Sequence, residues 1–306
     1  MVPGPLTTAL ALATLILIWG STFAAIAVGL EDIPPMTGIA LRFGISSALL
    51  LALARWQGVK LGRTSRERRL WWINGLLTFC VSYGVVYWAE QWLPSALAAI
   101  LYATFPLFVG LLAHWMLPDE PLTRQGLGGA CLGILGVIWI FADDLAALGG
   151  PMLLPAALIM LLSPFSSAIA NVAVKRWGAG LHPLSLTAVP MGICAVIMGI
   201  LAWLFESDQV VVWNLRSLGS LLYLALAGSA VTFTIYFWLL GYLRATRLSL
   251  ITFGVPIVAV LIGVLWRHEP ITVGMVGGTL LVLTGVSLTL RTPGRRLGRP
   301  GGASGA

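Results

Sequence analysis

Arg42 and Glu90 are charged residues that the sequence places within, or at the end of, long apolar runs. A charge inside an apolar membrane helix is costly, so it usually has a partner or a function. Because the two residues fall at similar depth in the second and third apolar runs, we predict that they form an ion pair. Such a pair would pin two helices together, form a gate, or attract a solute carboxylate. Glu90 also leaves proton coupling open, although no Asp, Glu or His lies at the middle of a run.

A second group of residues carries rings, hydroxyls and amides in the middle of apolar runs. Tyr83 and Tyr87 are four residues apart and therefore share one face of a helix. Trp and Tyr are common at membrane interfaces, so rings at mid-run are more informative. We predict a neutral cavity with scattered hydrogen-bonding groups, suited to a mid-sized solute with an apolar body. The residues predicted to bind that solute are Tyr83, Tyr87, Tyr102, Phe105, Ser163, Phe165, Ser167, Asn171, Phe233, Tyr236 and Thr252.

Glycine and proline within the apolar runs predict places where helices bend. A proline removes one helical hydrogen bond, and neighbouring helices and polar side chains can satisfy the freed backbone group. A static kink is the alternative reading of each. The candidate hinges are Gly20, Pro106, Pro164, Pro190 and Pro256.

The sequence contains no pattern of residues for several other chemistries. Cys80, Cys131 and Cys194 lie singly in apolar runs, with no histidine nearby to complete a metal site. A serine, histidine and aspartate grouping is absent, and so is a glycine loop that could hold phosphate. The sequence therefore predicts no metal site, no cofactor, no use of ATP and no enzymatic activity.

Membrane-spanning helices are the elements that must position these residues. The chain of 306 residues is 58% hydrophobic and 9% charged. A water-soluble protein of this composition would have too few polar residues to cover its apolar core. About 20 apolar residues cross the hydrocarbon core as a helix. By that rule the sequence predicts ten spans, at 6–28, 35–55, 71–91, 94–116, 123–142, 152–175, 184–205, 217–240, 247–266 and 272–290.

The basic residues predict how the spans are oriented. Most of the 18 Lys and Arg residues lie in one alternate set of connections and in the tail, whereas Arg216 and Arg267 lie in the other set. Lys and Arg are retained on the cytoplasmic side, so we predict a multi-pass inner-membrane protein with cytoplasmic termini. The basic connection 56–70 could also touch anionic lipid. Because the cations do not form one basic face, we expect no nucleic-acid partner.

A repeat links the two halves of the chain. "DEPLTRQGLGGACLGILG", which starts at Asp119, returns as "HEPITVGMVGGTLLVLTG", which starts at His268. Each unit would hold five spans, an odd number, so the second unit would enter the membrane from the other side, as in secondary transporters. Small residues spaced as in Gly129-x-x-x-Gly133 and Gly274-x-x-x-Gly278 predict close helix packing or dimerisation. We divide the chain into 1–145, 146–290 and a basic tail, 291–306, that we expect to be disordered.

Three stretches of the first half resemble a known family. They are "WGSTFAAIAVGLEDIPPMTGIALRF" from Trp19, "FPLFVGLLAHWMLPDEPLT" from Phe105 and "GLGGACLGILGVIWI" from Gly126. They are similar to the signatures of the EamA family in the drug/metabolite transporter superfamily, and the resemblance covers nearly the whole chain. It implies two five-helix units and export of amino acids, metabolites or other small solutes. The branch that we favour is that of the YddG-type aromatic amino-acid exporters. The second half departs from the pattern at its start, "LSPFSSAIANVAVKRW" from Leu162.

These observations combine into one prediction. We expect an all-α integral membrane protein of ten helices in two inverted five-helix repeats, with a central cavity between them. It would export small organic solutes, amino acids above all, by alternating access, as a monomer or homodimer. A drug, nucleotide-sugar or other metabolite carrier is the first alternative, although a nucleotide would need cations and only Arg42 lies within a span. A membrane enzyme is the second alternative.

Overall fold

The computed structural model describes residues 3–120, 124–148, 150–249, 251–269 and 271–290, and this part of the chain contains helices and no strand. The predicted tail, 291–306, lies outside the described residues. In chain order the helices, with π-helical segments written η, are α1 (Pro5–Leu30), α2 (Pro35–Trp56), α3 (Ser65–Asn74), η1 (Gly75–Ser82), α4 (Tyr83–Ala89), α5 (Ser95–Tyr102), α6 (Phe105–Met116), α7 (Arg124–Leu148), α8 (Leu153–Met160), α9 (Leu162–Trp177), α10 (Pro183–Phe205), α11 (Leu215–Ala225), η2 (Leu226–Val231), α12 (Thr232–Tyr242), α13 (Ala245–Leu248), α14 (Ile251–Arg267) and α15 (Val273–Leu290).

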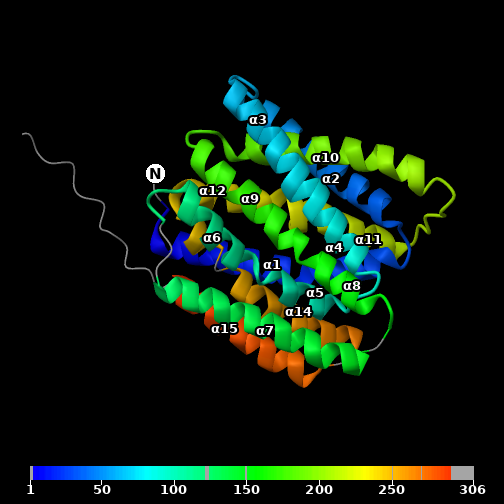
Figure 1. The fold of residues 1–306 in the computed structure, drawn as a ribbon. Coiled ribbons are helices and arrows are strands. Elements are labelled where there is room, and N and C mark those ends of the chain that lie inside the picture. The colour runs from blue at the N-terminus through cyan, green and yellow to red at the C-terminus, as the bar shows by residue number, and fades with distance from the viewer. Residues whose placement is uncertain (1–2, 121–123, 149, 250, 270, 291–306) are drawn as a thin grey trace, which may run out of the picture.

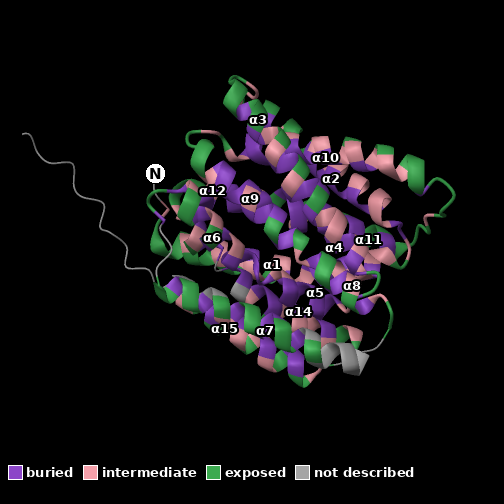
Figure 2. Ribbon diagram, in the orientation of Figure 1, coloured by how far each residue is buried: buried purple, intermediate pink, exposed green. Residues whose placement is uncertain are grey.

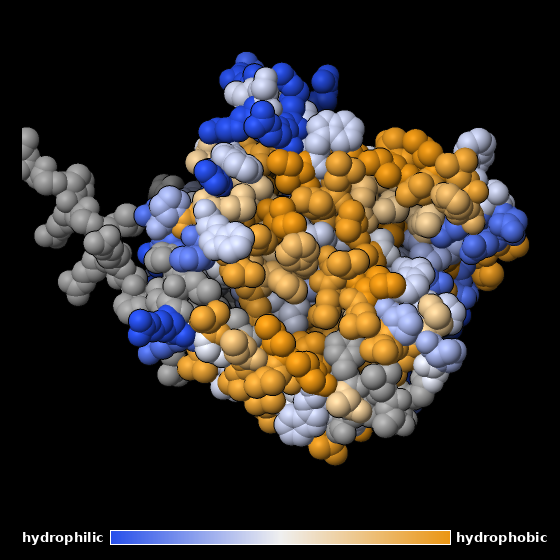
Figure 3. All heavy atoms as spheres, in the orientation of Figure 1, coloured by the Kyte–Doolittle hydropathy of each residue, from blue (hydrophilic) through white to orange (hydrophobic). Residues whose placement is uncertain are grey.

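The helices have the length and apolarity of a multi-pass membrane protein, which confirms the predicted class. Within the described residues, seven helical stretches are long and apolar enough to cross a bilayer, and three shorter apolar helices lie at the predicted fifth, ninth and tenth spans. Figure 3 shows a wide hydrophobic band with hydrophilic residues gathered at its edges. Buried residues fill the interior (Figure 2), whereas α7 and α10 expose apolar side chains such as Ile134 and Ile200 outward. Lipid tails tolerate that outward face because they are as apolar as the core.

We call the two ends of the helix bundle the basic end and the opposite end. The basic end carries the start of α3 with Arg66, Arg68 and Arg69, which projects at the top of Figure 1. The opposite end carries the end of α1 and the start of α11. Helix α1 runs toward the opposite end, and α2 returns from it toward the basic end (Figure 1).

Helices α7 and α15 lie side by side along one edge of the bundle (Figure 1), with glycines at their contact. A Cβ atom on Gly136 would lie 2.6 Å from the Gly278 carbonyl oxygen, and one on Gly285 would lie 2.4 Å from the Gly129 carbonyl oxygen. Only glycine permits that approach of two backbones. The predicted small-residue contact is therefore made within the chain.

Helices α1 and α14 also cross closely. A Cβ atom on Gly20 would lie 2.5 Å from Val258 Cβ, and one on Gly254 would lie 2.4 Å from Ile16 Cγ2. Gly20, predicted as a hinge, thus lies at a packing contact inside the continuous helix α1.

Several of the long helices are interrupted along their length. The span Ser95–Met116 breaks at Ala103 and Thr104, just before Pro106. Pro106 has no N–H to give to the carbonyl four residues earlier, so a helix that reaches Tyr102 restarts at Phe105 with proline in its first turn. A similar break separates α8 from α9 ahead of Pro164. The segments η1 and η2 widen the helices that contain them, a feature often found at functional sites.

Candidate functional site

A cavity of about 70 Å³ lies inside the bundle, and eight of the 18 residues that line it are aromatic. The residues that line it belong to α1, η1, α4, α5, α6, α9, α12 and α14. No residue of α2 or α10 is among those that line it. The lining residues are Trp19, Thr22, Phe23, Ile26, Thr78, Ser82, Tyr83, Val86, Tyr102, Phe105, Ser167, Asn171, Phe233, Tyr236, Phe237, Ile251, Thr252 and Val255.

The helix breaks place residues at the cavity. Tyr102 ends α5 and Phe105 begins α6, and their rings are stacked with centroids 5.9 Å apart. Ile251 and Thr252 begin α14 directly after the short helix α13. The Thr252 hydroxyl donates to the Ser249 carbonyl oxygen at 2.7 Å, which supports this turn. Two broken helices therefore present their inner ends to the same space.

The rings form two clusters around the cavity, one with Trp19, Phe233, Tyr236 and Tyr83 and the other with Phe23, Tyr102 and Phe105. Trp19 lies 5.2 Å from Phe233 and 5.3 Å from Tyr236 between ring centroids, and Phe23 lies 6.1 Å from Tyr102. Tyr83 meets Phe233 edge to face at 6.1 Å. Tilted and edge-to-face rings present both faces and edges to a solute, so the wall suits an apolar or aromatic body.

Polar atoms without a partner gather at one part of the wall. Trp19 Nε1, Ser167 Oγ and Asn171 Oδ1 are buried and make no hydrogen bond within the described residues. The Asn171 amide Nδ2 donates to the Tyr236 hydroxyl oxygen, which leaves that hydroxyl its own proton to donate. A buried polar group without a partner costs about 1–3 kcal/mol, so these atoms favour a polar ligand or water. They offer both donors and an acceptor, without a formal charge.

Eight of the predicted binding residues line the cavity, and three point elsewhere. Tyr87 is buried against Arg42, and Ser163 bonds to Ser82 through a hydroxyl contact of 2.7 Å. Phe165 packs on Phe108 with 39% of its surface exposed, so it faces outward from the bundle. The eight that line the wall are Tyr83, Tyr102, Phe105, Ser167, Asn171, Phe233, Tyr236 and Thr252.

The contribution of α1 was missing from the predicted site. Trp19, Thr22, Phe23 and Ile26 lie three or four residues apart and thus on one helix face. A mid-span tryptophan beside a threonine and a phenylalanine follows the same pattern that identified the other helices. The same reasoning, applied to the first apolar run, would have found this face.

The expected ion pair between Arg42 and Glu90 is not formed in the structure. Arg42 Nε donates to Ser229 Oγ at 2.7 Å, and Nη2 donates to the Gly228 carbonyl oxygen at 3.1 Å. Its guanidinium carbon also lies 4.6 Å from the centroid of the Tyr83 ring. Both Glu90 carboxylate oxygens are buried with no hydrogen-bond partner in the described chain. The bonds to η2 direct the guanidinium toward that segment, so Arg42 holds η2 in place behind the cavity wall.

The prolines predicted as hinges differ in their surroundings. Pro106 and Pro164 follow helix breaks, whereas Pro190 and Pro256 lie inside the continuous helices α10 and α14. At Pro190 the freed carbonyl is that of Leu186, and the Asn74 side chain donates to it at 2.7 Å. That bond satisfies the carbonyl group that Pro190 leaves without its helical partner.

No group of three or more His, Cys, Asp or Glu side chains within the described residues is arranged to hold a metal ion.

Comparisons with known proteins agree with the helical fold described above. The pattern of the EamA-like transporter family matches residues 6–142 and again residues 154–291. The chain belongs to the EamA-like transporter family. The two matches together cover nearly all of the described helices, so the fold and cavity above are those of a family member.

Two of three relatives compared with this EamA-like chain are transporters by name. The uncharacterized transporter YoaV of Bacillus subtilis is 29% identical over 280 residues, which cover 92% of this chain and 95% of YoaV. The uncharacterized inner membrane transporter YedA of Escherichia coli is 29% identical over 254 residues, or 83% of this chain and 80% of YedA. Protein PagO of Salmonella typhimurium is 24% identical over 80% of each chain.

A solved crystal structure shares the fold. It superposes with a TM-score of 0.69 at 21% sequence identity and covers 92% of this chain and 96% of its own. Family, relatives and helices agree that the protein is a multi-pass membrane transporter.

Proposed function

We propose that the protein is a secondary transporter that exports small organic solutes, foremost amino acids with aromatic or other apolar side chains. The observation that carries this proposal is the ring-lined cavity with unpaired polar atoms on its wall. Trp19 Nε1 and the Ser167 hydroxyl would donate to a carboxylate, and Asn171 Oδ1 would accept from an ammonium group. The rings would hold the side chain and stabilise the cation through their faces.

The proposal includes an arrangement of the chain in the membrane. Its ten spans would form two five-helix repeats of opposite orientation, for which the two family matches at 6–142 and 154–291 are the support. Retention of Lys and Arg on the cytoplasmic side would put the basic end in the cytoplasm, together with both termini. Substrate would then reach the cavity alternately from the two ends, as inverted repeats permit. A nucleotide sugar is a weaker candidate because none of the described residues that line the cavity is a cation.

The test is uptake of radiolabelled solutes by liposomes that contain only this protein. We expect neutral amino acids with aromatic or branched side chains to move above the level of empty liposomes, and charged amino acids to move less. Movement of none of them, with movement of a drug or nucleotide sugar instead, would replace this proposal with another carrier. Repeating the measurement across a pH gradient reports whether protons are coupled.

Ser167 supplies a matched prediction, because its neighbour Ser166 bonds away from the cavity to the Ser163 carbonyl oxygen at 3.0 Å. Ser167→Ala is expected to raise KM about 2- to 10-fold, since one hydrogen bond to the solute is worth roughly 0.5–1.5 kcal/mol. Ser166→Ala is expected to leave KM within twofold of the unmodified protein. Equal KM values for the two variants would show that the Ser167 hydroxyl does not bind the solute.

A further inference from the structure

Two glutamates, each followed by proline in the sequence, connect the same pair of broken helices at opposite ends. At the opposite end of the bundle, Glu269 Oε1 accepts from the Ser95 hydroxyl at 2.6 Å and from the Ser95 N–H at 3.1 Å. Glu269 Oε2 accepts from the Ala96 N–H at 3.0 Å. The carboxylate that follows α14 thereby caps the start of α5.

The basic end has the same arrangement with the roles of the helices exchanged. Glu120, which follows α6, accepts from the Ala245 N–H at 3.0 Å, the Thr246 N–H at 3.0 Å and the Thr246 hydroxyl at 2.6 Å. These donors belong to the first turn of α13. Free N–H groups and the positive end of a helix make charge-assisted bonds of this kind strong.

The consequence is that the α5–α6 and α13–α14 helices are fastened to each other at both ends. These are the two helices that break beside the cavity, and they supply Tyr102, Phe105, Ile251, Thr252 and Val255 to its wall. A metabolite that enters the cavity between these two helices requires their ends to separate on one side of the bundle. Separation at either end requires the loss of three hydrogen bonds to one carboxylate.

A second pair of helices is connected in a similar way but differs in what lies between its ends. Glu206, which follows α10, accepts from the Met36 N–H, the Thr37 N–H and the Thr37 hydroxyl, each at 2.8 Å. Along its length α10 packs directly on α2, where Ser47 Oγ donates to the Ala188 carbonyl oxygen at 2.8 Å. No residue of either helix is among those that line the cavity.

We propose that Glu269 and Glu120 are the two gate latches of the transport cycle, released one at a time, and that Glu206 is a static fastening. The proposal rests on the proposed function in one respect, because it assumes that solute enters from alternate ends. Release of Glu269 from Ser95 would open the opposite end, and release of Glu120 from Thr246 would open the basic end.

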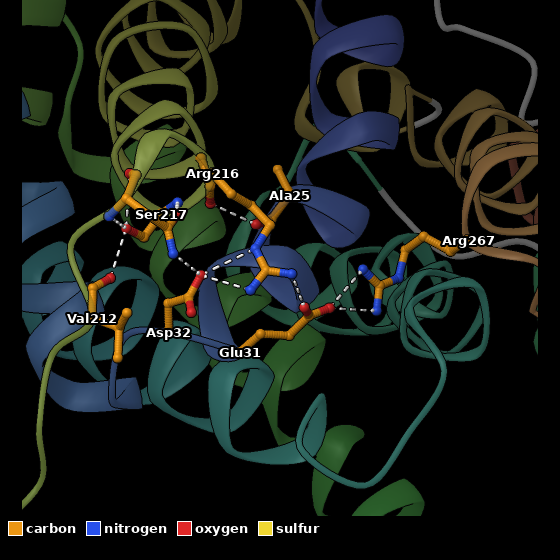
Figure 4. Close-up of polar contacts among 9 residues, drawn as sticks. Ala25, Glu31, Asp32, Val212, Arg216, Ser217 and Arg267 are labelled. Carbon is orange, nitrogen blue, oxygen red and sulfur yellow. Dashed lines mark hydrogen bonds and ion pairs between the residues drawn. The ribbon is translucent and has the colours of Figure 1, made fainter.

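The Glu269 latch has additional support that Glu120 lacks. Arg267 Nε lies 3.4 Å from Glu269 Oε1, and the same guanidinium reaches Glu31 at 3.4 Å. Glu31 and Asp32 in turn pair with Arg216 at 2.6 and 3.0 Å, which ties α1 to α11 and α14 (Figure 4). Glu120 makes no ion pair among the residues described here. We therefore expect the unmodified protein to open more readily at the basic end.

The test measures access to the cavity directly and needs no transported solute. Val255→Cys places a thiol on the cavity wall, in a chain whose own three cysteines are replaced by alanine. A membrane-impermeant maleimide is applied to one side or the other of sealed vesicles of known orientation. We expect Glu269→Gln to raise labelling at least threefold from the opposite end, Glu120→Gln to raise it from the basic end, and Glu206→Gln to change neither.

Several outcomes would overturn the proposal. Equal labelling of the Glu269→Gln and Glu120→Gln variants from the same side would show that the two carboxylates do not control separate ends. A response of Glu206→Gln as large as that of Glu269→Gln would show a general loosening of the bundle. The absence of any change in labelling would show that neither Glu269 nor Glu120 controls access to the cavity. If a glutamine variant does not fold, Ser95→Ala and Thr246→Ala remove the hydroxyl donors and make the same comparison. If each glutamine variant changes labelling from one side only, but the protein moves no amino acid, the assignment of the two latches stands and the proposed substrates are wrong.

Discussion

Gly136→Ala is expected to destabilise the protein, and Gly128→Ala on the same helix is expected to stabilise it slightly. A Cβ atom on Gly136 would lie 2.6 Å from the Gly278 carbonyl oxygen and 2.8 Å from the Val282 nitrogen. Both are backbone atoms of α15, so the two helices would have to move apart along their length. Overpacking of this kind costs roughly 1–3 kcal/mol. At Gly128 no atom lies within 4 Å of the added Cβ, and alanine favours a helix by roughly 0.5–1 kcal/mol over glycine.

Thermal unfolding of the purified protein in detergent checks this prediction. The melting temperature of Gly136→Ala should fall by several degrees, and that of Gly128→Ala should stay level or rise. If the two variants melt at the same temperature, the close contact of α7 and α15 is not a determinant of stability. Gly285→Ala, on the other helix of the pair, should behave like Gly136→Ala because its Cβ would meet the Gly129 carbonyl oxygen.

The same glycines show what the sequence could tell and what it could not. Spacing of four residues marks a face on which backbones can approach, and that prediction agrees with the α7–α15 contact. Spacing alone does not say which helix approaches, so packing within the chain and dimerisation were equally compatible with it. The partner is decided by the positions of all other helices.

Span positions followed from apolarity, but helix boundaries and breaks followed from local hydrogen bonding. The third predicted span, 71–91, begins earlier in the structure because Thr64 caps the helix by accepting from the Glu67 N–H at 3.1 Å. Apolarity cannot detect such a polar first turn. Pro106 did indicate the break in the fourth span, whereas no residue pattern that we know of predicts η1 or η2.

Cavity residues were predicted from type and depth, and helix rotation explains why three of them do not line the cavity. Asn171 and Phe165 lie on the same helix, yet one faces the cavity and the other faces outward. In a soluble protein a polar face would identify the outward side. In a membrane both sides are apolar, so the sequence of α9 alone does not tell which face is inward.

Arg42→Leu is expected to lower both stability and transport severely. Arg42 is fully buried, and its guanidinium serves the Gly228 carbonyl oxygen and the Ser229 hydroxyl of η2 while it supports the Tyr83 ring. Leucine would remove the donor from both acceptors, at a cost of about 1–3 kcal/mol for a buried group left unsatisfied, while the Ser229 hydroxyl would keep its bond to the Leu224 carbonyl oxygen. The Tyr83 ring would also lose its cation–π contact, so the cavity wall should shift. We expect transport to fall at least tenfold, with a melting temperature well below that of the exposed control, Arg55→Leu, at the end of the same helix.

Arg42→Lys separates the two roles that a buried cation could have. If Arg42 holds η2, as its bonds indicate, a lysine keeps the charge but cannot reach both acceptors, because its ammonium is a point charge without the planar fork of arginine. Stability and maximal rate should then fall while KM for amino acids stays nearly unchanged. If Arg42 instead attracted the solute carboxylate, lysine would keep the stability and raise KM. Melting curves and initial rates measured on the same preparation distinguish the two, and a rise in KM at unchanged melting temperature would contradict the assignment of Arg42 to η2.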